Sequence, residues 1–117
     1  MIIRTGIDLA RIDRFARLSE NPRFLRRVFT TSELIDCRPA HLAGTFAAKE
    51  AIIKAVGIPL AWHALEIVRG PSGRPRVGLT PSDCLSTLQA IDVSISHDGD
   101  YAVAVAVAIF SATGDDA

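Results

Sequence analysis

Residues Tyr101 to Phe110 read YAVAVAVAIF, an uncharged run in which alanine alternates with larger side chains. Successive side chains of a β-strand point to opposite faces, so a strand here has one face of alanine and another of valine, isoleucine and tyrosine. An alanine face lets a neighbouring element approach closely. The run is also too short to cross a membrane as a helix. The sequence therefore predicts a long strand with a closely packed partner.

The segment 42–56 has the composition of that partner. A helix at about 100° per residue places its large apolar side chains within one arc, and alanines fill most of the remainder. Gly57 is a suitable C′ residue to end the helix. Because no fully polar face is left, we expect this helix to be covered on both sides. The alanines that we expect to meet the strand are Ala47, Ala48, Ala51 and Ala55.

The other elements follow from apolar spacing and from turn and cap signals. A capping box at Thr30–Glu33 predicts a helix from Thr31 to before Pro39. The expected strands cover residues 1–7, 65–69, 74–79 and 93–96, and further helices cover 9–19, 22–29 and 81–90. Hairpin turns are expected at Pro71–Gly73 and at Asp98–Gly99. This order indicates an α+β fold, an antiparallel sheet of hairpins packed against helices, in one domain spanning 1–117.

Charge and cysteine usage exclude several classes of function. The formal net charge is zero, which gives no global electrostatic case for binding nucleic acid or membranes. Two cysteines without metal-ligand spacing argue against a zinc site or a disulfide framework. No signal peptide is visible, so we expect a cytoplasmic protein. The first 27 residues are nonetheless basic, with arginine at positions 4, 11, 14, 17, 23, 26 and 27.

Both lysines of the chain, Lys49 and Lys54, flank Glu50 on the apolar helix. One interpretation is a Glu50–Lys54 pair at i, i+4, worth about 0.2–0.5 kcal/mol. Another is a ligand site, because a carboxylate beside large apolar groups loses hydration and needs a cation. Mg²⁺ is such a cation, and it usually takes one or two carboxylates together with phosphate oxygens. Asp8, at the expected end of the first strand, is a candidate second ligand or else a helix N-cap.

Two further features fit a phosphate-bearing ligand. Gly73–Arg74–Pro75 belongs to a rigid turn with an arginine, although an ordinary hairpin turn is the simpler interpretation. Ser96 and His97 follow a strand, but adjacent strand residues point to opposite faces, so we reject a serine nucleophile with a histidine base. His97 is better suited to donating to a phosphate or to closing a turn.

Taken together and in this order, these motifs resemble the holo-acyl-carrier-protein synthase family of 4′-phosphopantetheinyl transferases. The similar stretches cover nearly the whole chain. They are Gly6-Ile7-Asp8-Leu9, Phe29-Thr30 with Ser32-Glu33-Leu34, Phe46 to Ala51 with Lys54-Ala55, Gly73-Arg74-Pro75, and Val93 to His97 followed by Tyr101-Ala102.

The resemblance implies transfer of the phosphopantetheine arm of coenzyme A to a serine of an apo acyl carrier protein, with release of 3′,5′-ADP. It implies that Asp8 and Glu50 hold Mg²⁺ and that Lys54 contacts a phosphate oxygen. It implies that the Gly73–Pro75 turn, including Arg74, and His97 bind the nucleotide end of coenzyme A, and that Ser96 also binds coenzyme A. It also implies a homotrimer with sites between subunits. An acidic carrier protein would dock on the basic N-terminal region, through Arg11, Arg14, Arg17, Arg23, Arg26 or Arg27.

One position departs from the family pattern. Many relatives carry an arginine immediately before the Phe-Ala-x-Lys-Glu run, where this chain has Thr45. If that arginine holds a phosphate of coenzyme A, Arg74 or Arg76 could replace it. Two alternatives stay open: a non-catalytic module that binds coenzyme A, and a structural oligomer in which Lys49, Glu50 and Lys54 form interface salt bridges.

Overall fold

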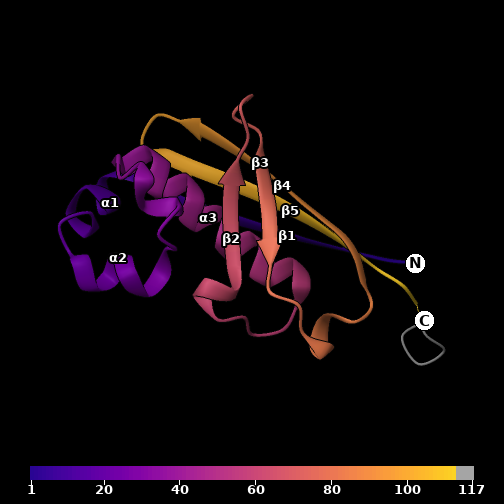
Figure 1. Cartoon of the computed structure of the whole chain (residues 1–117). Coiled ribbons are helices and arrows are strands. Elements are labelled where there is room, and N and C mark those ends of the chain that lie inside the picture. The colour runs from indigo at the N-terminus through magenta and orange to yellow at the C-terminus, as the bar shows by residue number, and fades with distance from the viewer. Residues whose placement is uncertain (113–117) are drawn as a thin grey trace.

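The structure, a computed structural model, describes residues 1–112. Its largest element is a three-stranded antiparallel sheet in the order β1 (Ile2–Arg11), β5 (Tyr101–Phe110) and β4 (Leu88–Asp98). The strands β4 and β5 form a hairpin in which Gly99 takes a φ of 58°, as the Asp98–Gly99 turn signal predicts. β1 pairs with the other edge of β5 over its whole length (Figure 1).

The two faces of β5 differ as predicted. Its four alanines are buried, whereas Tyr101, Val105 and Val107 remain exposed on the opposite face. The helix α3 (Pro39–Val56) lies against the alanine face, and its own Ala47, Ala48, Ala51 and Ala55 are also buried. The predicted close packing of an alanine strand on an alanine helix is therefore confirmed.

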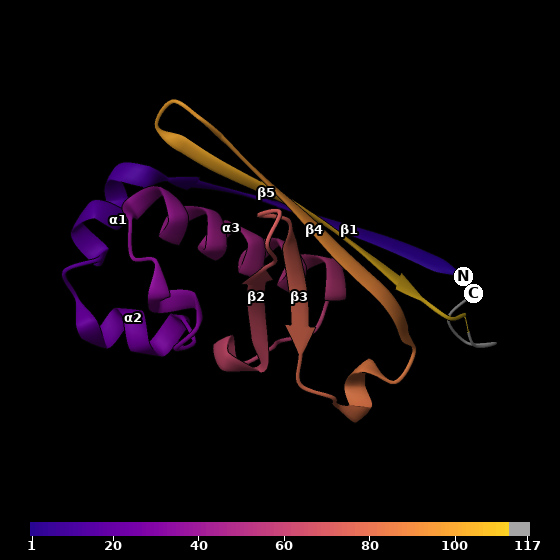
Figure 2. The same cartoon turned by 45° about the horizontal axis from the view of Figure 1, so that its top comes forward.

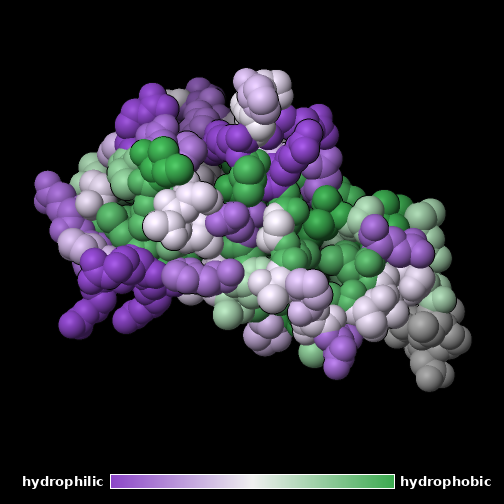
Figure 3. Space-filling view, viewed as in Figure 1, coloured by the Kyte–Doolittle hydropathy of each residue, from purple (hydrophilic) through white to green (hydrophobic). Residues whose placement is uncertain are grey.

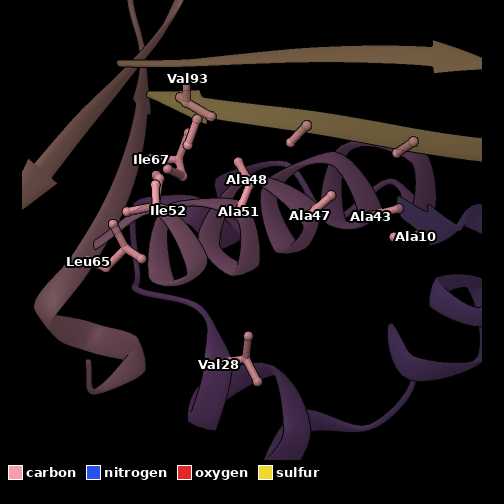
Figure 4. Close-up of a cluster of buried hydrophobic side chains, with 14 of the residues drawn as sticks. Ala10, Val28, Ala43, Ala47, Ala48, Ala51, Ile52, Leu65, Ile67 and Val93 are labelled. Carbon is pink, nitrogen blue, oxygen red and sulfur yellow. The ribbon is translucent and has the colours of Figure 1, made fainter. Parts of the chain in front are cut away.

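Elements pack on most sides of α3, which explains why it has no continuous polar face. A two-stranded sheet of β2 (Leu65–Arg69) and β3 (Pro75–Leu79) lies across it, with α1 (Ile12–Leu18) and α2 (Pro22–Val28) near its N-terminal end (Figure 2). Figure 4 shows side chains around α3 that come from the sheet, from β2 and from α2. The observed architecture confirms the α+β class with antiparallel sheets.

The ends of α3 follow local chemistry. Its first helical residue is Pro39, three residues before the predicted start at Leu42; proline suits this position because the first helical N–H has no partner inside the helix. Its C′ residue is Gly57, at a φ of 79°, and the Gly57 N–H donates to the Ile53 carbonyl at 3.0 Å. The predicted end is confirmed.

Several predicted boundaries are wrong. β1 continues to Arg11 and the first helix starts at Ile12, because the long strand β5 offers β1 a partner for every residue. The expected helix over 81–90 is only a 3₁₀ turn, η3 (Asp83–Leu85), and pairing with β5 draws residues from Leu88 onward into β4. The capping box at Thr30 leads to a single 3₁₀ turn, η1 (Glu33–Ile35), rather than a helix.

A short 3₁₀ turn, η2 (Trp62–Ala64), leads from α3 into β2. Trp62 packs on Phe46 of α3, with ring centroids 5.6 Å apart, and Phe46 contacts Phe15 of α1 at 5.3 Å. This aromatic cluster joins α1 and η2 to the middle of α3. Within residues 1–112, no helix is long and apolar enough to cross a membrane.

Candidate active site

Three of the predicted site residues meet where β1 passes α3. Asp8 lies two residues from Gly6 and therefore on the same face of β1, the face that packs on α3. The Lys54 ammonium donates to the Ile7 carbonyl at 2.9 Å and to Asp8 Oδ1 at 3.2 Å. Lys54 therefore pairs with Asp8, and not with Glu50 as the i, i+4 interpretation of the sequence had it. The N-cap role of Asp8 is wrong, because Asp8 lies within β1 and Arg11 occupies the N-cap position of α1.

Glu50 is close enough to Asp8 for the two charges to interact. Burial raises the pKa of Glu50 above its usual value, and the Asp8 carboxylate raises it further. Lys54 and Arg14 act in the opposite direction and only partly offset these effects. The corner of β1 and α3 therefore holds two carboxylates that repel each other, an arrangement that an added cation would stabilise.

The residues at this corner fit Mg²⁺. Its preferred ligands are oxygens, and two carboxylates with substrate phosphate oxygens and water complete a common site. Among residues 1–112, no three His, Cys, Asp or Glu side chains come together as a ready-made metal cluster. The donor set of Asp8 and Glu50 therefore suits an ion that arrives with a phosphate ligand, and Lys54 supplies a further positive charge beside it.

Lys49, one residue before Glu50, has no part in this corner. Its side chain is 0% exposed, and its ammonium donates to Glu33 Oε1 at 2.7 Å and to the Val28 carbonyl at 2.9 Å. Glu33 Oε2 accepts from the Ile67 N–H at 2.7 Å. The suggested interface salt bridge of Lys49 is wrong, because this lysine ties η1 and β2 to α3 inside the core.

The predicted docking arginines are spread over three elements, β1, α1 and α2. Arg11 ends β1 and pairs with Asp13 at 3.0 Å, whereas Arg14 and Arg17 lie on α1. The Arg14 guanidinium lies 5.8 Å from the ring centroids of both Phe15 and Phe46. Arg23, Arg26 and Arg27 lie on α2, and hydrophilic side chains gather at this end of the molecule (Figure 3).

The residues predicted for the nucleotide end lie elsewhere. Gly73 is at the tip of the β2–β3 hairpin with a φ of 83°, and exposed Arg74 pairs with Asp92 of β4 at 3.0 Å. His97 Nε2 lies 3.0 Å from the Ala40 carbonyl, at the N-terminal end of α3. Ser96 is opposite Val103 in the register and lies on the outer face, which confirms that Ser96 and His97 point to opposite sides of β4.

The candidate residues thus form two groups within one chain. The first is Asp8, Glu50 and Lys54, and the second is the Gly73–Pro75 turn with Ser96 and His97. Asp8 is level with Ala104 on β5 and with Ile95 on β4, so two strand spacings, roughly 10 Å, separate its strand from that of His97. The helix α3 passes over the sheet between the two groups, contacting His97 through Gly44 and Gly6 through Ala51. A ligand that contacts both groups must therefore reach around α3, or bind one group from one subunit and the other group from a second subunit.

One residue near the second group was missed by the sequence analysis. Arg69, at the end of β2, has its Nε and Nη2 atoms buried, and neither has a hydrogen-bond partner among the described residues. Burial lowers the pKa of this guanidinium, and the Asp36 carboxylate opposes the shift. The period of two in Leu65, Ile67 and Arg69 places all three on the inward face of β2, and this pattern could have identified Arg69 from the sequence.

Comparison with known proteins identifies the family of this chain. Residues 4–106 match the family model described as the 4′-phosphopantetheinyl transferase superfamily. A holo-[acyl-carrier-protein] synthase of Geobacter sulfurreducens is 43% identical over an alignment that covers 92% of this chain and 97% of the relative. A holo-[acyl-carrier-protein] synthase of Frankia casuarinae is 38% identical with the same coverages.

Solved structures of such synthases share the fold. The Helicobacter pylori enzyme in complex with coenzyme A has a TM-score of 0.82 and 31% identity, covering 90% of this chain and 99% of that one. The Mycobacterium tuberculosis acyl carrier protein synthase has a TM-score of 0.75 and 36% identity, covering 92% of this chain and 97% of the other. The similarity therefore includes both β1, with Asp8, and α3, with Glu50 and Lys54.

Proposed function

Because the chain belongs to the 4′-phosphopantetheinyl transferase superfamily, we propose that it transfers the 4′-phosphopantetheine arm of coenzyme A to a serine hydroxyl of an apo acyl carrier protein. The observation that carries this proposal is the corner where Asp8, Glu50 and Lys54 meet. Coenzyme A brings a diphosphate, and a site of two carboxylates with a lysine suits a metal-bound diphosphate.

In the proposed reaction the serine oxygen attacks the phosphorus that carries pantetheine. A new P–O bond forms, the bond to the bridging oxygen of the diphosphate breaks, and 3′,5′-ADP leaves. Asp8 and Glu50 would hold Mg²⁺, which supplies charge neutralisation on the diphosphate when it is bound. Lys54 is placed to contact a phosphate oxygen. The nucleophile belongs to the carrier protein, and either Glu50 or a water molecule receives its proton.

We also propose that the enzyme works as a homotrimer with sites between subunits. On the face of the large sheet away from α3, apolar side chains lie in register on adjacent strands: Ile7 opposite Val105, and Leu9 opposite Val103. Ile7 and Leu9 are 63% and 61% exposed. Contiguous exposed apolar side chains of this kind commonly mark an interaction surface. Covering this face with another subunit would bring the two residue groups from different chains together. The number three comes from the family resemblance.

The carrier protein is expected to approach the α1–α2 end. Arg14 is near Glu50, so a partner docked there lies beside the corner where transfer is proposed. Acidic carrier proteins suit a surface with Arg17, Arg23, Arg26 and Arg27 exposed. This charge complementarity mainly affects the rate of association, so it should weaken with salt.

A mass-shift assay tests the proposed function. Purified enzyme is incubated with an apo acyl carrier protein and coenzyme A, with Mg²⁺ or with EDTA. We expect the carrier protein to gain the mass of phosphopantetheine only with Mg²⁺, and 3′,5′-ADP to appear in equal amount. The variant Glu50→Gln should lose the transfer while keeping its fold. Binding of coenzyme A without any transfer to several carrier proteins would favour a non-catalytic module instead.

A further inference from the structure

A cavity of about 460 Å³ opens at the corner where β1 passes α3. Its lining residues are Ile7, Asp8, Leu9, Lys54 and Val103. The Lys54 side chain is 54% exposed and that of Asp8 is 19% exposed, so the lysine has more freedom to change its rotamer than the carboxylate has. A cation or a phosphate that enters this cavity therefore meets Lys54 as well as Asp8.

The structure pairs the Asp8 carboxylate with a cation of the chain itself. The Lys54 ammonium donates to Asp8 Oδ1 at 3.2 Å, and a second bond, to the Ile7 carbonyl at 2.9 Å, holds it beside that carboxylate. A divalent cation takes its ligands from carboxylate oxygens. Lys54 and a metal ion therefore compete for Asp8.

Glu50 has no comparable partner. No ion pair within residues 1–112 includes Glu50, although Lys54 lies one helical turn after it on α3. A metal ion that bridges the two carboxylates would give Glu50 a cation and would weaken the pair that Asp8 already has. The gain at Glu50 is therefore partly offset by the loss at Asp8.

The balance of charge indicates when this exchange is favourable. Asp8 and Glu50 bring two negative charges when both are ionised, and Lys54 brings one positive charge. Mg²⁺ alone would make the corner positive, and the ammonium would repel it. The diphosphate of coenzyme A has two negative charges, which cancel those of Mg²⁺. Metal and diphosphate together therefore leave the net charge of the corner unchanged.

Lys54 can also change acceptors without losing its place. An ammonium has three N–H donors, of which the structure uses two, on Ile7 and Asp8. A phosphate oxygen is a strong acceptor for the third donor, or for the one that Asp8 gives up. The bond to the Ile7 carbonyl can remain throughout, so the exchange needs only a small movement of the side chain.

We infer that Lys54 is the counter-ion of Asp8 until a phosphate replaces that carboxylate, and that this exchange makes the protein bind metal and coenzyme A together rather than metal alone. The inference rests on the proposed function. To the phosphate contact of Lys54 it adds a second role, which is to set when the metal binds. The corner then takes the metal as part of a metal–diphosphate complex.

The test measures metal binding with and without coenzyme A, and it does not require catalysis. The probe is Mn²⁺, which prefers the same oxygen ligands as Mg²⁺ and whose unbound fraction is measured by electron paramagnetic resonance. Lys54→Met should bind Mn²⁺ alone about 10-fold more tightly than the wild-type protein, because the competing charge is gone. Coenzyme A should increase the affinity for Mn²⁺ by a smaller factor in this variant than in the wild-type protein.

Two variants keep or remove a positive charge in a controlled way. Lys54→Arg keeps a cation beside Asp8, so its binding of Mn²⁺ alone should stay as weak as that of the wild-type protein. Arg4→Gln removes an exposed charge on the same face of β1, roughly 13 Å from Asp8 along the strand. That distance exceeds the Debye length, so Mn²⁺ binding should stay within about 2-fold of the wild-type value.

A double variant locates the additional affinity. Lys54→Met combined with Asp8→Asn should lose the gain of Lys54→Met, because the carboxylate for which the two cations compete is then absent. If the double variant keeps the gain, the ion binds elsewhere and the inference is wrong.

The sign of the effect decides the main question. Weaker Mn²⁺ binding by Lys54→Met would overturn the inference, because Lys54 would then orient Asp8 for the metal instead of competing with it. Unchanged binding would overturn it as well. Failure of the proposed function appears in a different measurement: the wild-type protein would leave the apo carrier protein unmodified in the mass-shift assay, whatever its affinity for Mn²⁺.

Discussion

Gly6 of β1 and Ala51 of α3 are in direct backbone contact. A Cβ atom placed on Gly6 would lie 1.9 Å from the Ala51 carbonyl oxygen and 2.8 Å from the Ala55 nitrogen. No side chain separates the strand from the helix at this point. Asp8 lies two residues along the same face of β1, and Glu50 is next to Ala51. The contact therefore sets how closely the two proposed metal ligands approach each other.

Gly6→Ala should destabilise the protein and separate Asp8 from Glu50. The methyl group cannot fit without moving backbone, so we expect a loss of about 3 kcal/mol or more in the free energy of unfolding, measured with urea. Transfer activity should fall even at temperatures where the variant is folded. The control is Gly78→Ala in β3, where the nearest atom to the new Cβ is 3.7 Å away. Equal stability of both variants would contradict this account of the contact.

The two lysines of the chain should separate stability from activity. Lys49→Met leaves the buried Glu33 carboxylate without its cation, so we expect a loss of about 3–5 kcal/mol in the free energy of unfolding. Lys54→Met removes an exposed ion pair and should cost less than about 1 kcal/mol, yet it should abolish most of the transfer activity. Urea unfolding and the mass-shift assay, run on both variants, check this prediction.

A double-mutant cycle sharpens the Lys49 prediction. Glu33→Gln alone should also be destabilising, because it leaves the buried ammonium of Lys49 unpaired. The double variant should lose less stability than the sum of the single variants, since neither charge is then left alone. Simple additivity would show that Lys49 and Glu33 do not stabilise each other.

Glu50→Gln should stabilise the metal-free protein at neutral pH while removing its activity. The folded-state pKa of Glu50 is raised, chiefly by burial, so its contribution to stability is present below the unfolded pKa and is lost as pH rises through the folded pKa. In EDTA at pH 7.5 the variant should therefore have the higher Tm. The difference should vanish below about pH 4, where the carboxyl is protonated in both states.

Magnesium gives the complementary measurement on the same pair of proteins. Mg²⁺ with coenzyme A should raise the Tm of the wild-type protein at pH 7.5, because a ligand that binds only the folded state stabilises it. The same addition should raise the Tm of Glu50→Gln much less. A Tm increase of equal size in both proteins would remove Glu50 from the metal site.

Ile7→Lys or Val105→Lys on the outer face of the sheet should prevent assembly. These side chains lie opposite each other in the register, so one lysine places a charge in the centre of the proposed interface. Light scattering coupled to size exclusion should give a trimer mass for the wild-type protein and a monomer mass for either variant. Ile35→Lys is the control, because Ile35 is 85% exposed on η1, away from the sheet. A monomeric wild-type protein would contradict the proposed trimer.

The sequence was informative wherever local chemistry decides the structure. The alternation in β5, the glycine turns at Gly73 and Gly99, and the end of α3 at Gly57 were predicted correctly. Each of these features depends on residues that are close together along the chain.

Features that depend on distant pairing were missed. Residues 86–90 favour a helix locally, but β5 offers them a full row of backbone partners, so they form a strand. The partner of Lys49 is Glu33, 16 residues earlier, and no spacing rule connects the two. The Asp8–Lys54 contact spans 46 residues. Asp8 and Lys54 were assigned to one site only through the family resemblance.

The composition of β5 has a consequence for the chain before it folds and assembles. Ten consecutive uncharged residues, six of them of high β-propensity and none of them proline or glycine, have the composition of a segment that forms intermolecular sheets. In the folded chain β1 and β4 occupy both edges of β5, so its backbone is not available to other molecules. A slow or incomplete pairing of β1 would leave one edge open. Aggregation during expression should therefore be most sensitive to changes in β1, the strand that also carries Asp8.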